Sequence, residues 1–67
     1  MLDTIPGVYI TRAALTLPEA ASAPDEPHYV EIRRRGRRIR ITFNRLEYKR
    51  GKTAHWSWTA SSAALAE

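Results

Sequence analysis

Arginine is concentrated in one short stretch of this chain, YVEIRRRGRRIRITF, from Tyr29 to Phe43. A guanidinium group stays charged at any physiological pH and presents a planar fork that fits phosphate or carboxylate oxygens. A run of such groups with few acids beside it repels itself unless an anion binds. The pattern therefore indicates a surface for a polyanion. Its candidate contacts are Arg33, Arg34, Arg35, Arg37, Arg38, Arg40, Arg45, Lys49, Arg50 and Lys52.

Charge is distributed unevenly over the 67 residues, which carry a net charge of +4. Residues 1–27 contain one arginine and four acids, whereas residues 28–52 contain ten basic residues and two acids. Residues 53–67 contain a single acid. A mildly acidic arm, a strongly basic middle and a nearly neutral tail predict that one part of the fold faces a polyanion.

Nucleic acid, DNA or RNA, is the polyanion that we expect. A twisted two-stranded β ribbon can enter a DNA groove, and arginine-rich segments bind structured RNA. Tyr29 and Tyr48 fall on the basic side of the expected strands, where exposed rings could stack with bases or arginines. Such a protein would be a small regulator, and the excess of arginine over lysine with abundant alanine hints at a bacterial or phage genome.

Three other interpretations stay open. The same arginines could dock on an acidic or nucleic-acid-binding host protein, as a phage-type inhibitor or adaptor of the anti-CRISPR kind would. The chain could be a structural component of a virion. The cations could also be a solvated edge that merely prevents strand-to-strand aggregation.

Other classes of function find little support in the sequence. There is no cysteine, the two histidines His28 and His55 have no ligand spacing with acids, and no nucleophile–base pattern is present. We expect no enzyme activity, no metal and no cofactor. No apolar stretch approaches the roughly 20 residues of a membrane span, and the first residues do not resemble a secretory signal. We therefore expect a cytoplasmic protein, in the host cell if phage-encoded.

The elements that would position the arginines are β-strands. Apolar residues alternate with polar ones on both sides of Gly36, which predicts a hairpin with Arg35 and Gly36 as its two-residue turn. In that register every apolar pair falls on one face and the acid Glu31 meets an arginine. The predicted cross-strand pairs are Ile32–Ile39, Val30–Ile41, His28–Phe43, Glu31–Arg40 and Tyr29–Thr42.

A second hairpin is predicted with its turn at Arg50 and Gly51, so that Phe43 faces Trp58 and Ile41 faces Ala60. Leu46 and Tyr48 are out of phase with Phe43, so either a bulge near Asn44 and Arg45 realigns them or they lie on the outer face. The result is a three-stranded antiparallel meander near residues 28–35, 37–48 and 53–60. Its predicted buried residues are Val30, Ile32, Ile39, Ile41, Phe43, Trp56 and Trp58.

The segments outside this meander are expected to cover or extend it. Residues 7–15, GVYITRAAL, can form a fourth strand, and TLPEAASA a short helix capped by Thr16. SAPDEP is a loop, and SSAALAE is expected to form a C-terminal helical turn over residues 61–67. We thus predict a small, mainly β, α+β domain of residues 1–67 with a three- to four-stranded antiparallel sheet. Residues 1–27 are an acidic arm over the tryptophan face, residues 28–60 a basic meander, and an edge strand could pair with a second copy.

One short motif resembles a known family. LTLPEAAS, from Leu15 to Ser22, is similar to the start of the first helix in excisionase and MerR-like winged-helix proteins. Loop and strand residues follow where those families have a recognition helix. The resemblance therefore ends at Ser22 and implies no function for this chain.

Overall fold

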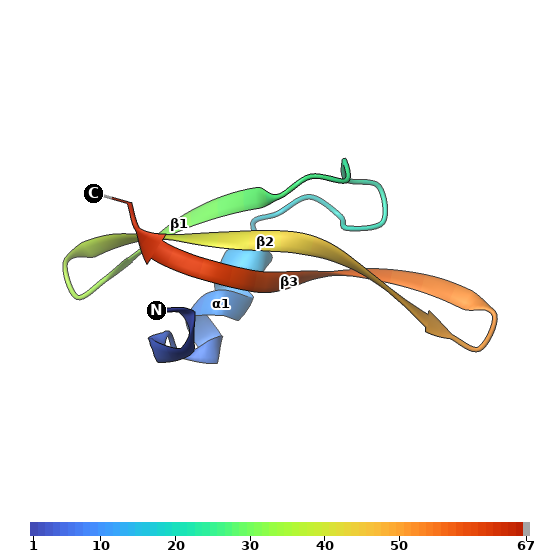
Figure 1. The fold of residues 1–67 in the computed structure, drawn as a ribbon, viewed down its shortest axis with the longest axis horizontal. Coiled ribbons are helices and arrows are strands. Elements are labelled where there is room, and N and C mark those ends of the chain that lie inside the picture. The colour runs from blue at the N-terminus through green and yellow to red at the C-terminus, as the bar shows by residue number, and fades with distance from the viewer. Residues whose placement is uncertain (67) are drawn as a thin grey trace.

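The sheet of this protein is a simple antiparallel meander. The computed structural model describes residues 1–66. A 3₁₀ turn η1 (Leu2–Thr4) and a helix α1 (Gly7–Ala14) precede three strands, β1 (His28–Arg34), β2 (Arg37–Arg50) and β3 (Thr53–Leu65). The strands form one open sheet in the order β1-β2-β3 (Figure 1). The predicted fold class, a mainly β protein with a small helical part, is confirmed.

The first hairpin has the predicted register throughout. Ile32 pairs with Ile39, Val30 with Ile41 and His28 with Phe43, and the pairs Glu31–Arg40 and Tyr29–Thr42 also occur. Arg34 and Arg37 close the turn, and both turn residues have left-handed backbone, with φ 54° at Arg35 and 77° at Gly36. Two such residues in a row are the mark of a type I′ turn, whose twist matches that of the strands.

The second hairpin turns one residue later than predicted. Arg50 pairs with Thr53, so the two loop residues are Gly51 and Lys52 rather than Arg50 and Gly51. Gly51 has φ 63°, which is the glycine position of a type II′ turn. Moving the turn by one residue moves every partner by two positions, and a shift of two keeps each side chain on its face. Phe43 thus pairs with Ala60, and Trp58 pairs with Arg45.

A β-bulge lies in β3, opposite Thr42 and Phe43, and β2 has none near Asn44 and Arg45. Thr42 pairs with Ser62 and Phe43 with Ala60, which leaves Ser61 without a partner residue in the ladder. The Ser61 hydroxyl accepts a hydrogen bond from Asn44 (2.9 Å) and donates one to the Thr42 carbonyl (3.3 Å). The bulge allows both Ala60 and Ala63 to face the core. Since β2 has no bulge of its own, Leu46 and Tyr48 lie exposed on the outer face, which was the stated alternative.

The predicted C-terminal helical turn is wrong for residues 61–65, which form a strand. Residues 61–65 continue β3, and the Ala66 amide bonds to the Arg38 carbonyl at 3.0 Å, while Glu67 lies outside the described residues. A helix of so few residues gains little from its own hydrogen bonds. Pairing with β2 satisfies the same backbone groups and places Ala63 opposite Ile41.

The N-terminal predictions are wrong in type. Residues 7–14 form α1 instead of a fourth strand, and the residues of TLPEAASA form turns instead of a helix. Ile10, Ala13, Ala14 and Leu17 recur at helical spacing and pack on the core, and this packing outweighs the strand preference of Val8 and its β-branched neighbours. The Thr16 hydroxyl donates to the Ala13 carbonyl (2.7 Å) at the end of α1, so Thr16 follows a helix instead of starting one.

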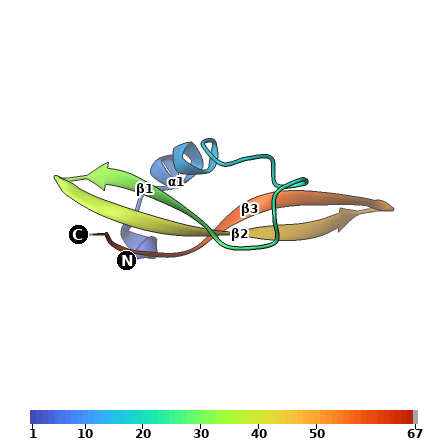
Figure 2. The ribbon, with the colours of Figure 1, turned by 90° about the horizontal axis from the view of Figure 1, so that it is seen from above.

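The core lies between the N-terminal arm, residues 1–27, and one face of the sheet. Ile39, Ile41 and Phe43 from β2 are buried together with Ile5 and Ala13 from the arm. Val30, Ile32 and Trp58 are partly buried against them. The helix lies on one side of the twisted strands (Figure 2), so the opposite face of the sheet is open. The inner and outer faces of the first hairpin are therefore those that the sequence predicts.

Candidate nucleic-acid interface

The end of the first hairpin is a cluster of like charges, which we call the first tip (Arg33, Arg34, Arg35, Arg37 and Arg38). Antiparallel pairing places Arg33 directly opposite Arg38 and Arg34 directly opposite Arg37. Arg34 is half-buried, with its guanidinium 5.9 Å from the centre of the Tyr9 ring, and the other four are exposed. Like charges directly opposite each other destabilise a sheet. The cross-strand pairing within the first tip thus opposes folding, although Arg34 gains a contact with Tyr9.

The outer face of the sheet extends this cluster through Arg40 and Tyr29. Glu31 lies between two arginines, 3.5 Å from Arg40 and 3.8 Å from Arg38. The Arg40 guanidinium also lies 5.9 Å from the centre of the Tyr29 ring, which is 62% exposed. One carboxylate shared by two guanidinium groups leaves a net positive surface with an aromatic ring beside it.

Three arginines of the first tip have no internal counter-charge. Within residues 1–66, Arg33, Arg35 and Arg37 form no ion pair. All three are exposed, so their forks are open to a ligand in solvent. This arrangement suits the phosphates of a nucleic acid, which accept bidentate hydrogen bonds from arginine.

Arg45 is a sequence-predicted contact that the fold uses internally. Its side chain is only 10% exposed. Nε donates to the Ala20 carbonyl (2.7 Å), a terminal nitrogen donates to the Ala21 carbonyl (3.4 Å), and the guanidinium lies 4.0 Å from the centre of the Trp56 ring. The cation thus fastens the arm to the sheet, and we leave it out of the candidate surface.

Lys49, Arg50 and Lys52 form a separate group, the second tip, at the end of the second hairpin. All three are exposed. The two tips lie at opposite ends of the molecule, whose long axis measures 45 Å (Figure 1). The ten candidate contacts therefore do not form one surface, because the two tips lie at the two ends of the long strand β2.

An aromatic pair on the second hairpin was only half predicted. Tyr48 is 46% exposed, as expected, and its ring stacks on that of His55 with centroids 5.4 Å apart and planes at 21°. The sequence predicts only Tyr48 as an exposed ring here, whereas His55 lies exposed on the same outer face. Tyr48 pairs with His55 because the turn residues are Gly51 and Lys52. A predicted turn at these two residues would have placed the two rings side by side.

The tryptophans lie on the inner face, as their spacing predicts. Trp58 packs on the core, donates its indole N–H to the Pro18 carbonyl (2.8 Å) and contacts the His28 ring edge-on at 4.7 Å. Trp56 is half-buried under Arg45. Neither indole is presented as a stacking platform for bases.

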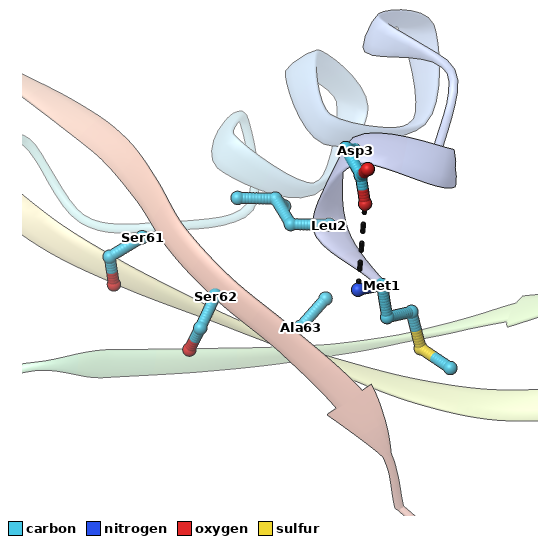
Figure 3. Close-up of a pocket in the computed structure, with 6 residues that line it drawn as sticks. All are labelled: Met1, Leu2, Asp3, Ser61, Ser62 and Ala63. Carbon is cyan, nitrogen blue, oxygen red and sulfur yellow. Dashed lines mark ion pairs between the residues drawn. The ribbon is translucent and has the colours of Figure 1, made fainter.

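A further candidate site lies outside the two tips. A hollow beside β3 is lined by Met1, Leu2, Asp3, Ser61, Ser62 and Ala63 (Figure 3). Its one ion pair joins the Met1 amino group to Asp3 at 3.5 Å, while the Ser61 hydroxyl is hydrogen-bonded to Asn44 and to the Thr42 carbonyl. Residues 1–66 contain no cluster of three His, Cys, Asp or Glu side chains able to hold a metal, and no helix among them is long and apolar enough to cross a bilayer.

Comparison with protein-family models, with curated proteins and with solved structures found no match to this chain. Function is therefore inferred from the geometry of the first tip and the outer face.

Proposed function

We propose that this chain is a small nucleic-acid-binding module that contacts the phosphate backbone through the first tip and the adjoining outer face. The observation that carries the proposal is the pairing of Arg33 with Arg38 and of Arg34 with Arg37 across the hairpin. Cross-strand pairs of like charge oppose folding, so stability alone would favour uncharged or oppositely charged partners there. A bound polyanion removes this repulsion.

The backbone of the turn supports the same conclusion. Arg35 has φ 54°, a left-handed conformation that costs an ordinary residue about 1–2 kcal/mol and that asparagine or glycine adopts more easily. Strain of this kind persists where the surrounding structure and the function demand it. A guanidinium at the very end of the ribbon, at the expense of turn stability, is what binding to phosphates would require.

The ligand chemistry follows from the residue types. Exposed Arg33, Arg35 and Arg37 would each bind phosphate oxygens, and Arg40 with Tyr29 would flank the strand that approaches the sheet. Contacts of this kind position a protein on nucleic acid without reading its sequence. We expect general binding to duplexes, with any base preference coming from a guanidinium that reaches guanine edges. With this ligand, the cytoplasm is the compartment that we expect.

The test is a fluorescence anisotropy titration of a labelled duplex at about 50 and 200 mM salt. For roughly five phosphate contacts, the affinity should fall about 500-fold between these concentrations. Arg37→Gln should weaken binding and reduce the slope of log affinity against log salt by about one. Arg12→Gln is the matched control, because Arg12 is exposed on α1, belongs to neither tip, and its loss changes the net charge equally.

Two results would contradict the proposal. One is a wild-type protein that binds neither duplex DNA nor RNA at the lower salt concentration. The other is an equal effect of Arg37→Gln and Arg12→Gln, which would mean that net charge and not the first tip governs binding. Capture of an acidic host protein that survives nuclease treatment, without duplex binding, would favour the inhibitor or adaptor interpretation.

A further inference from the structure

The second hairpin continues well beyond the body of the protein. β1 begins at His28, opposite Phe43, so from Asn44 onward the sheet consists of β2 and β3 alone. The arm is held to this ribbon by hydrogen bonds that Arg45 and Trp58 donate to carbonyls of the arm, and by an ion pair of Arg45 with Asp25 at 3.9 Å. Past these residues a bare two-stranded ribbon projects outward (Figure 1). Such a ribbon has a width that the major groove of DNA admits.

The projecting ribbon carries its own set of groups for a polyanion. Lys49, Arg50 and Lys52 are exposed, and within residues 1–66 none of them forms an ion pair. The stacked rings of Tyr48 and His55 lie directly behind the turn. Cations beside exposed aromatic rings are the combination that proteins use to hold nucleic-acid strands.

The two tips are placed so that they would not contact the same stretch of nucleic acid. They stand at opposite ends of a molecule 45 Å long, and β2 connects them as one continuous strand from Arg37 to Arg50. When one tip enters a groove end-on, the strand holds the other tip on the far side of the protein. That second tip then faces a different stretch of nucleic acid.

We infer that the protein is bivalent and bridges two nucleic-acid segments, one at the first tip and one at the second tip. This inference rests on the proposed function of the first tip and adds a second, independent binding end. Each end alone would bind a duplex with modest affinity. Joined by a rigid strand, the two ends would hold two duplexes together at a separation set by the ribbon.

The experiment measures bridging and single binding separately. Beads carrying one short duplex are incubated with protein at low salt and washed, and a second, fluorescent duplex is then added. Two variants lose three charges each, R33Q/R35Q/R37Q at the first tip and K49Q/R50Q/K52Q at the second. All six side chains are exposed, and circular dichroism checks that both variants keep the fold.

Wild-type protein should retain the fluorescent duplex on the beads. Each triple variant should still bind a single duplex in anisotropy but retain at least about tenfold less of the second duplex, because only one binding end is left. Four possible results would contradict the proposed function or the bivalency. No single-duplex binding by the wild type would refute the proposed function itself. Single-duplex binding without retention of the second duplex would refute bivalency alone.

The variants supply the remaining two outcomes. Bridging by K49Q/R50Q/K52Q at the wild-type level would overturn the inference and point to self-association of the protein as the cause. Complete loss of single-duplex binding in R33Q/R35Q/R37Q, at concentrations where K49Q/R50Q/K52Q binds, would also overturn it, since the second tip would then not be a binding end.

Discussion

At the scale of single residues, the same side-chain type has opposite roles in this protein. Arg37 is exposed at the first tip without an internal ion pair in the described chain, whereas Arg45 is nine-tenths buried and bonded to backbone carbonyls. Both residues lie at odd positions of β2 and therefore on the same face, so the difference comes from how far the arm extends along the strand. Odd positions face the arm wherever the arm reaches, and Arg45 is the odd position under Ala20 and Ala21.

Arg45 is expected to matter for stability and not for ligand binding. Replacement by alanine should lower the free energy of unfolding by about 2–3 kcal/mol, because two carbonyls of the arm lose a charged donor. Arg45→Lys should recover only part of this loss, since an ammonium has no planar fork and stacks poorly on Trp56. Urea unfolding measures both. Arg50→Ala is the control, and a variant of Arg45 as stable as that control would contradict this role.

Arg35 should show the reverse behaviour. Its left-handed backbone suits asparagine better, so Arg35→Asn should raise the free energy of unfolding by roughly 0.5–1 kcal/mol. The same change removes a guanidinium from the first tip and should weaken duplex binding. Thermal unfolding and anisotropy on one protein sample measure the two effects. If Arg35→Asn lowers stability, the strain argument for the first tip is wrong.

At the scale of elements, the two hairpins differ in how much of them could be predicted. Around Gly36 the alternation is regular on both sides, and the observed turn pairs Ile32 with Ile39, whereas a turn one residue later would place Ile39 opposite Arg34. Around Gly51 two turn positions keep the same faces, because they differ by two in register. Glycine is also the second turn residue in one hairpin and the first in the other, so its position alone does not locate the turn.

The bulge offers a test of how the faces of the sheet are maintained. Deleting one of the two adjacent serines, Ser61 or Ser62, restores regular pairing and leaves Ala60 and Ala63 on the core face. We expect a loss of only about 1–2 kcal/mol, from the hydrogen bonds of the Ser61 hydroxyl. Deleting Thr42 instead should abolish folding, because Ile41 and Phe43 would then face opposite sides. Circular dichroism and denaturant unfolding separate the two, and equal damage would refute the assigned register.

At the scale of the whole molecule, the fold is a rod with a small central core. The radius of gyration of its Cα atoms is 12.9 Å, whereas a compact chain of this length would have about 11 Å. The sheet is open at both edges. The free edge of β3, from Thr53 to Leu65, contains no lysine, arginine, aspartate or glutamate. The shape follows from the length of β2 and β3, which extend past the segment that the arm covers.

Small-angle X-ray scattering can check this shape. A monomer should give an asymmetric pair-distance distribution with a maximum dimension no smaller than the 45 Å long axis of the Cα trace. The sheet has an open inner face without the arm, so the first 27 residues should be needed for this profile. A chain that starts at His28 should scatter as an unfolded polymer or an aggregate. A folded, rod-shaped monomer without the arm would contradict the role of Ile5 and Ala13 in the core.

The sequence by itself determined the first hairpin, its inner and outer faces, and the arginine character of its tip. Those features depend on contacts between residues close in the chain, where alternation, one glycine and the pairing of apolar residues with one another favour one register. The tertiary structure alone decided that residues 7–14 form a helix, that the tail extends β3, that Arg45 fastens the arm, and that the cations divide between two distant ends. Each of these depends on packing between segments far apart in the chain, and such packing overrides the weak local preferences of short segments.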